Sequence, residues 1–259
     1  MNIARKLLVV AFFTLIPLAH AQAPQRTTEW RAKEIMGEAF VDCRTMAAYY
    51  GHTLTNEERD RLEWIPFSEE TLQKSRETHI LVPGFPMTIA EIRAKVPAAF
   101  TSRFWDSGRH GPYFDDDIGS AASEKVRLQW FLLRKNIVQG STSKTYDEAV
   151  RMLGPDEELP RACELVNAMV VYWLATGTKL FSGLYSHSSS LVPPDGTYLR
   201  HDGVIAKHHM PNVLVPKYGN DIIVGGFDER GIGGGQSPRK GGSAVEGIAP
   251  MRKIADNSR

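Results

Sequence analysis

A run of apolar residues between positions 159 and 177 limits the folds open to this chain more than any other segment does. Positions three and four apart are apolar along one helix face: Leu159, Ala162, Cys163, Val166, Met169, Val170, Trp173 and Leu174. This spacing predicts an amphipathic helix, and Gly177 follows it as a residue that often ends helices. Its most apolar part, 166–174, is shorter than the roughly 20 residues of a membrane span. We therefore expect a helix that packs into a protein core.

Helix signals dominate the first hundred residues. A second apolar helix face predicts one helix over 29–50, and its members are Met36, Ala39, Phe40, Cys43, Met46, Ala47 and Tyr50. Thr55 followed by Glu58 has the form of a capping box and predicts a helix start. Ser68 begins another short helix that ends near residue 76, and 87–96 is predicted to be helical as well.

Strand signals become frequent later in the chain. We expect a buried strand at 78–82, an alternating strand at 125–133, and further strands at 181–191, 203–205 and 221–227. Between them, Ser143 or Thr145 caps a helix that runs to Leu153. Helices early, strands late and no regular alternation predict an α+β fold, in which N-terminal helices precede a mixed or antiparallel sheet with packed helices.

The first 21 residues have the form of a secretory signal peptide. Arg5 and Lys6 precede an apolar run at 7–18, and Ala19-His20-Ala21 is a small-x-small cleavage site that leaves Gln22 as the mature N-terminus. We expect a soluble periplasmic or secreted protein with no membrane span in the mature chain. Its organisation is predicted as a single α+β domain over 22–240, followed by a flexible C-terminal tail at 241–259.

Charge is nearly balanced, with 31 basic and 30 acidic residues and a formal net charge of +1. Cleavage of the leader removes Arg5 and Lys6 and shifts this value to −1. Because nucleic-acid-binding domains usually carry a basic patch or stripe, general nucleic-acid binding is not expected. No sequence pattern points to a particular cofactor, substrate or partner.

Both cysteines of the chain, Cys43 and Cys163, fall on apolar helix faces. An even number of cysteines in an oxidising compartment is compatible with a disulfide. Buried free cysteines, which behave as small apolar residues, fit the same pattern. A catalytic thiol is disfavoured, because neither position suggests the exposed, electropositive setting that lowers a thiol pKa.

The middle of the chain carries a series of short motifs. It resembles a family of uncharacterised bacterial proteins in the order of Leu133-Arg134-Lys135-Asn136, Ser141-Thr142-Ser143-Lys144-Thr145, Ala175-Thr176-Gly177, Leu180-Phe181, Gly226-Phe227-Asp228 and Ser237-Pro238-Arg239-Lys240. The resemblance covers about 79–240 and implies no activity, cofactor or catalytic residue. The chain departs from the family pattern by its leader, by an insertion at 192–219 and by a Gly-rich run at 231–235.

The alternative function is an exported hydrolase that uses the His187 to His209 region. In one version of this hypothesis the hydrolase depends on a metal ion. The candidate ligands are His187, His201, Asp202, His208 and His209, with Asp115, Asp116 and Asp117 as additional oxygen donors. Imidazole and carboxylate are ligand types that zinc accepts. Their spacing matches no established metal motif, and a solvated polar loop explains them equally simply.

A set of basic residues forms the most coherent candidate for binding. It consists of Arg134, Lys135, Lys144, Arg239 and Lys240, all within the resembling motifs. Arginine offers a planar fork that matches carboxylate or phosphate, and lysine adds a point charge. The alternative is an ordinary solvated rim with salt bridges to neighbouring acids. For the basic residues taken alone, the solvated rim is the preferred interpretation. The preferred function is a binding or interaction module, and within it the hypothesis to test is that Arg134, Lys144 and Arg239 share one anion-binding surface.

Overall fold

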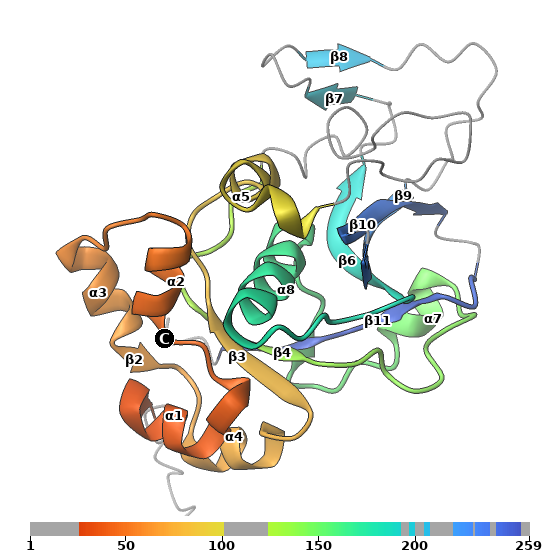
Figure 1. The fold of residues 1–259 in the computed structure, drawn as a ribbon. Helices are drawn as coiled ribbons and strands as arrows, with labels where there is room; N and C mark the ends of the chain where they lie inside the picture. Colours follow the sequence, from red (N-terminus) through yellow and green to blue (C-terminus); the bar gives the residue numbers. More distant parts are fainter. Residues whose placement is uncertain are drawn as a thin grey trace, which may run out of the picture.

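The long apolar helix occupies the centre of the molecule, between two sheets (Figure 1). The structure is a computed structural model, and it describes residues 26–100, 124–192, 197–199, 205–207, 220–229, 231–238 and 242–254. The central helix α8 (Ala162–Thr176) ends at Gly177 in the left-handed conformation, as predicted. All residues of α8 from Ala162 to Tyr172 are buried, so the helix packs on all sides and not on one face alone.

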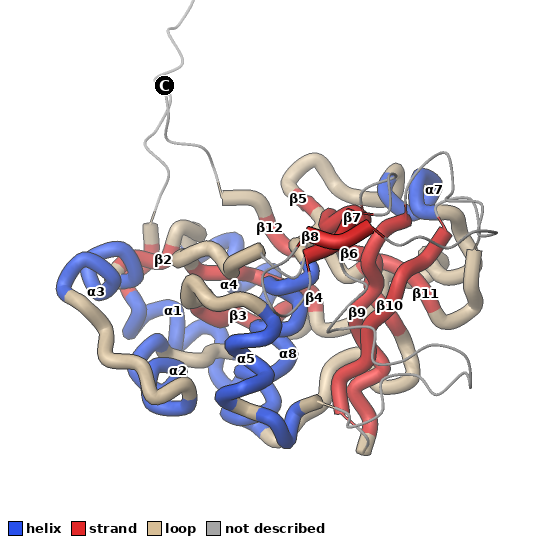
Figure 2. Tube along the Cα trace, turned by 90° about the horizontal axis from the view of Figure 1, so that it is seen from above, coloured by secondary structure: helices blue, strands red, loops and turns tan. Residues whose placement is uncertain are grey.

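Short helices make up much of the N-terminal half (Figure 2). They are α1 (Glu29–Met36), η1 (Gly37–Ala39), α2 (Cys43–Tyr49), α3 (Asn56–Leu62), α4 (Glu69–Ser75), α5 (Ile89–Lys95) and η2 (Pro97–Ala99). Side chains cap α1 to α5 at their N-termini. The expected single helix over 29–50 is wrong. Gly37 has a φ of +55° and ends α1, and the Asp42 carboxylate caps a new helix. Between them the Val41 amide donates to the Leu81 carbonyl, which draws the chain alongside the first sheet.

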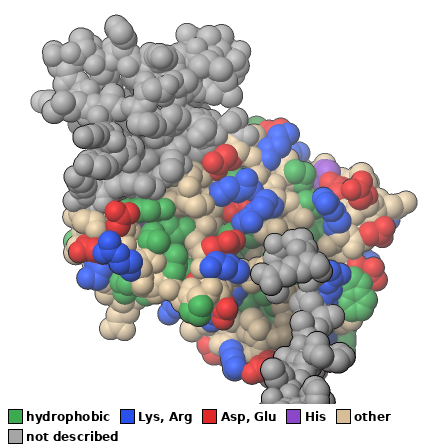
Figure 3. Space-filling view, turned by 180° about the vertical axis from the view of Figure 1, so that it is seen from behind, with side chains coloured by type: hydrophobic (Ala, Val, Ile, Leu, Met, Phe, Trp, Pro, Cys, Tyr) green, Lys and Arg blue, Asp and Glu red, His purple; other side chains and the backbone are tan. Residues whose placement is uncertain are grey.

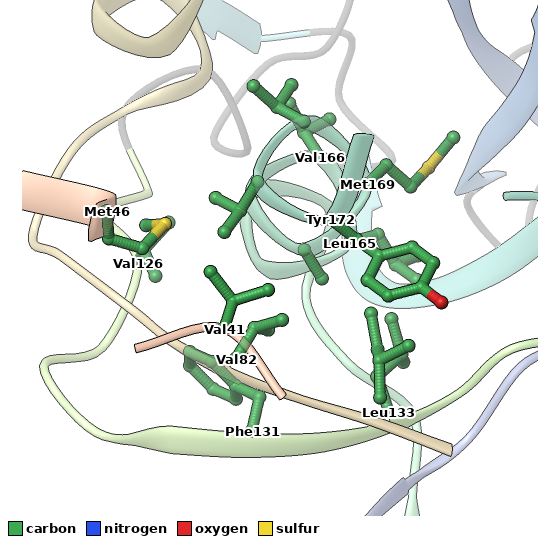
Figure 4. Close-up of a cluster of buried hydrophobic side chains, with 14 of the residues drawn as sticks. Val41, Met46, Val82, Val126, Phe131, Leu133, Leu165, Val166, Met169 and Tyr172 are labelled. Carbon is green, nitrogen blue, oxygen red and sulfur yellow. The ribbon is translucent and has the colours of Figure 1, made fainter. Parts of the chain in front are cut away.

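The first sheet has the order β3-β4-β12-β5, with antiparallel neighbours. Its strands are β3 (His79–Pro83), β4 (Trp130–Arg134), β12 (Met251–Arg252) and β5 (Glu157–Glu158). Val82, Phe131 and Leu133 point from one face toward α8 (Figure 4). On the other face Trp130 stacks on Phe40 at 5.5 Å.

The second sheet lies across α8 and has the order β10-β9-β6-β11. Its strands are β6 (Tyr185–Val192), β9 (Asn220–Asp228), β10 (Gly231–Pro238) and β11 (Glu246–Ile248). Antiparallel pairing joins the first three, and β11 is parallel to β6. The remaining elements are α7 (Tyr146–Val150) and the two-stranded pairs β1 (Thr27–Thr28) with β2 (Trp64–Ile65) and β7 (Thr197–Leu199) with β8 (Ile205–Lys207). These features confirm the predicted α+β class.

The Gly-rich run at 231–235 is part of β10, which pairs with β9. Close packing explains Gly225 on β9, since a Cβ at this position would meet the Leu184 carbonyl oxygen. The C-terminal segment differs from expectation. Residues 246–248 and 251–252, expected in a flexible tail, form β11 and β12. Backbone groups of β6, β4 and β5 are available to pair with these two strands. Within the described ranges, no helix is both long enough and apolar enough to cross a bilayer.

Candidate anion-binding site

The basic residues of the sequence hypothesis are only partly brought together. Arg134 ends β4 and Lys135 follows it, and the Arg134 amide donates to the Pro250 carbonyl at 2.9 Å. Lys144 does not lie beside Arg134. The amide of its neighbour Ser143 donates to the Ser243 carbonyl, which precedes β11, whereas Pro250 beside Arg134 follows β11. Arg239 and Lys240 lie outside the described residues.

Sheet register places other polar side chains beside Arg134. His79 pairs directly with Arg134, and Arg252 pairs with Glu157. Directly paired residues share a face of a sheet, and residues two apart on one strand do so as well. Met251 pairs with Leu133, so Arg252 lies on the same face as Arg134 and His79. This face is the one opposite α8.

His79 is a buried imidazole with one unused nitrogen. His79 is 3% exposed, and its Nδ1 lies 2.8 Å from the Thr78 hydroxyl oxygen. Desolvation, together with the positive charges of Arg252, Arg134 and Lys135, lowers the pKa of His79 to about 4. The ring is therefore neutral at pH 7. The Thr78 hydroxyl donates to the Ser75 carbonyl at 3.4 Å, so its oxygen accepts from His79 Nδ1. The proton of the neutral ring then resides on Nδ1, and Nε2 is an acceptor.

Three buried polar atoms in this region make no hydrogen bond with any described residue: Ser75 Oγ, His79 Nε2 and Arg252 Nε. Ser75 is 1% exposed and lies one turn before His79, with its carbonyl accepting from the Thr78 amide at 3.0 Å. Buried polar groups without a partner are rare, because each forfeits several favourable interactions with water. Ser75 Oγ and Arg252 Nε can each present a hydrogen, which suits them to an acceptor-rich ligand.

The surrounding charge is positive. Arg134, Lys135 and Arg252 supply three cations, and the nearest carboxylate is Glu157, with its Oε1 4.0 Å from an Arg134 guanidinium nitrogen. Glu157 Oε2 is already engaged by the Gly154 amide at 2.9 Å. The Arg134 side chain is 33% exposed, so the buried donors lie beneath a rim that solvent reaches. Acidic and basic side chains alternate over the face in Figure 3, so positive charge is not spread broadly there.

A second buried charge cluster is satisfied internally and provides a contrast. The Glu164 carboxylate is buried at the start of α8 and accepts from Arg127 Nε at 2.6 Å and from Arg161 at 2.7 Å. Burial would raise the pKa of Glu164, but the hydrogen bonds from both arginines outweigh it and lower the pKa. Arg127 also reaches Glu158 at 3.4 Å. This cluster has a structural explanation that the His79 group lacks.

The proposed metal ligands are mostly beyond what the structure shows. His201, Asp202, His208, His209 and the 115–117 acids lie outside the described residues. His187 is buried on β6 with its ring edge-on to Tyr146, 5.7 Å between centroids. Among the described residues, no three His, Cys, Asp or Glu side chains gather as a metal site.

Both cysteines are buried and free. The disulfide alternative therefore gives way to the alternative of two core thiols. Desolvation raises the pKa of Cys43 to about 12, and the nearby Glu29 carboxylate adds to the effect. Burial likewise raises the pKa of Cys163 to about 12. Neither residue is a thiolate at neutral pH.

Sequence reasoning found Arg134 and Lys135 but missed Ser75, His79 and Arg252. A histidine at the start of an apolar strand was a usable signal for His79. Arg252 gave none, because its position was assigned to a tail. Comparison of the chain with protein-family models, with curated proteins and with solved structures finds no match.

Proposed function

We propose that this protein is a binding module that holds a small oxyanion, or the acidic group of a larger ligand, at the site formed by Ser75, His79, Arg134, Lys135 and Arg252. The observation that supports this proposal is the set of three buried polar atoms without a partner among the described residues, two of them hydrogen-bond donors, beside three cationic side chains. Hydrogen bonds between charged groups are the stronger class, so an anion would satisfy these donors at a favourable free energy.

The chemistry of the residues defines how the ligand would be held. Arg252 Nε and Ser75 Oγ would donate to its oxygens from the buried side, and His79 Nε2 would accept from a protonated ligand oxygen. Arg134 and Lys135 would supply charge from the exposed rim. Because the pKa of His79 is about 4, the imidazole is neutral at pH 7 and is not a fourth cation. Phosphate, sulfate and carboxylate all match the two donors and the cationic rim.

The compartment belongs to the same proposal. A leader with the form of 1–21 would deliver the module to the periplasm or the extracellular space. Intact-mass measurement of protein exported from a bacterial host should give a chain that begins at Gln22. The alternative hydrolase rests, apart from His187, on residues outside the described ranges, and no observation in the described part favours it over binding.

The test measures stabilisation by sodium phosphate, sulfate and acetate at constant ionic strength, by thermal unfolding. A ligand at about 100 times its Kd stabilises a folded protein by about 2.7 kcal/mol. We expect the parent to be stabilised by at least one of these anions, and Arg134→Ala to lose most of that effect. Lys144→Ala, which removes a cation located away from the site, serves as the matched control.

Ser75→Ala makes the test sharper. It removes a buried hydroxyl that has no partner among the described residues, so the free protein should be as stable as the parent or slightly more stable. The same change should weaken the anion response. Equal anion responses in the parent, Arg134→Ala and Ser75→Ala would refute the proposal.

A further inference from the structure

A separate cleft of about 430 Å³ lies at the other end of β4 from the anion site. Its apolar part is formed by Trp64, Pro66 and Ile254, with the buried Trp130 behind them. Five polar side chains complete the lining: Arg26, Glu57, Asp60, Arg61 and Gln129. Sites for small ligands combine an apolar surface with a few convergent polar groups in this way.

The polar side chains of this cleft are not used by the fold. Among the described residues, none of the five makes a side-chain hydrogen bond or an ion pair. Nearby surface charges behave differently, since Arg31 pairs with both Glu34 and Glu69. A structural role therefore does not explain the cleft residues.

Helix α3 shows why this is unusual. Glu57 and Arg61 are four residues apart, in the orientation that favours an ion pair along a helix. Asp60 lies on the same side, and Leu62 is the residue of α3 that is buried. Glu57 and Arg61 nonetheless form no ion pair, so both side chains remain available to a ligand.

The apolar contribution comes from an exposed indole. Trp64 is 42% exposed and lies opposite Thr28 in the β1-β2 pair. Large aromatic side chains are usually well buried, and a partly exposed one inside a cleft marks a contact surface. The face of an indole presents a flat, electron-rich surface to C–H groups.

Charge defines the class of ligand. Arg26 and Arg61 balance Glu57 and Asp60, so the lining has no net charge and selects neither cations nor anions. Carboxylates, guanidinium groups and the Gln129 amide are planar groups that bind two neighbouring hydroxyls at once. We infer that this cleft binds a neutral saccharide of one or two rings, with one sugar face on Trp64 and its hydroxyls on the polar rim. The inference is independent of the anion site.

The experiment uses saturation-transfer NMR on the full chain with maltose, cellobiose and chitobiose, and with tri-alanine as a peptide probe. At least one saccharide should give a saturation-transfer signal with the parent. Trp64→Ala should lower the affinity for that saccharide about tenfold or more, since stacking and apolar contact are lost together. Asp60→Asn should also weaken binding. Trp30→Ala is the matched control, because Trp30 is 72% exposed and does not line the cleft.

Thermal unfolding of each variant establishes that it is folded before binding is compared. Arg134→Ala should leave saccharide binding unchanged, which separates this site from the anion site. Absence of binding for all three saccharides, retention of binding in Trp64→Ala, or preference for tri-alanine would each overturn the inference.

Discussion

His79 should cause the folded protein to lose stability on acidification. Its folded pKa of about 4 lies below the reference value of 6.5, so the unfolded chain takes up a proton at a higher pH than the folded protein does. Stability is therefore greatest above pH 6.5 and falls as the pH decreases toward 4. Linkage gives a loss of about 2 kcal/mol by pH 5 and about 3 kcal/mol by pH 4.

Urea unfolding followed by circular dichroism, at several pH values from 7.5 to 5, measures this loss. His79→Gln retains a polar side chain but cannot titrate, so its stability should change by about 2 kcal/mol less than that of the parent over this range. The difference between the two proteins isolates His79, because acidic groups such as Glu58 and Glu164 contribute equally to both. If His79→Gln is not folded at pH 7.5, NMR titration of the His79 imidazole in the parent measures the folded pKa directly.

An anion bound at the proposed site should change the pKa of His79, which gives a second expected result. Arg252, Arg134 and Lys135 disfavour protonation of His79, with Glu157 as the nearest opposing charge. A bound sulfate would offset those cations, raise the pKa of His79 and reduce the loss of stability in acid. Identical pH profiles for the parent and His79→Gln would show that the imidazole is not desolvated, and the reasoning would be wrong.

Other expectations concern stability and thiol chemistry. Glu164→Gln should lower the free energy of unfolding by about 1 to 3 kcal/mol. The arginines that lose their buried partner keep contact with solvent, since the side chains of Arg127 and Arg161 are 42% and 29% exposed. Glu158→Gln at the more exposed contact should cost less than about 1 kcal/mol, and urea titration of both variants tests the contrast. Ellman's reagent should detect two thiols in denatured, unreduced protein and react very slowly with the folded protein, and a mass two hydrogens lighter than the reduced chain would contradict this. Gly225→Ala should give little soluble protein, because its Cβ would collide with the Leu184 carbonyl; normal yield and unchanged melting would exclude the predicted collision.

Local signals in the sequence were enough to predict most helix ends. Thr55 with Glu58 forms a complete capping box, Ser68 caps α4, and Thr145 caps α7. Gly177 ends α8 in the left-handed conformation. In each case the interaction joins residues within four positions of one another, so it can be read from a short window of sequence.

Features that depend on distant partners could not be predicted in this way. The 29–50 helix is interrupted where Val41 bonds to Leu81 in a separate strand. The residues of the proposed anion site illustrate the same limit. Arg134 stood out as a basic motif residue, but only strand register brings His79 and Arg252 to it.

The placement of β11 and β12 bears on how the chain is made. Residues 246–252 complete both sheets, and β12 lies between β4 and β5 rather than at a sheet edge. Because these residues follow the other described strands in the sequence, β4 and β5 can be joined through β12 only after the strands of the second sheet have been synthesised. The second sheet differs in this respect, since β10, β9 and β6 can pair with one another before β11 is added at its edge.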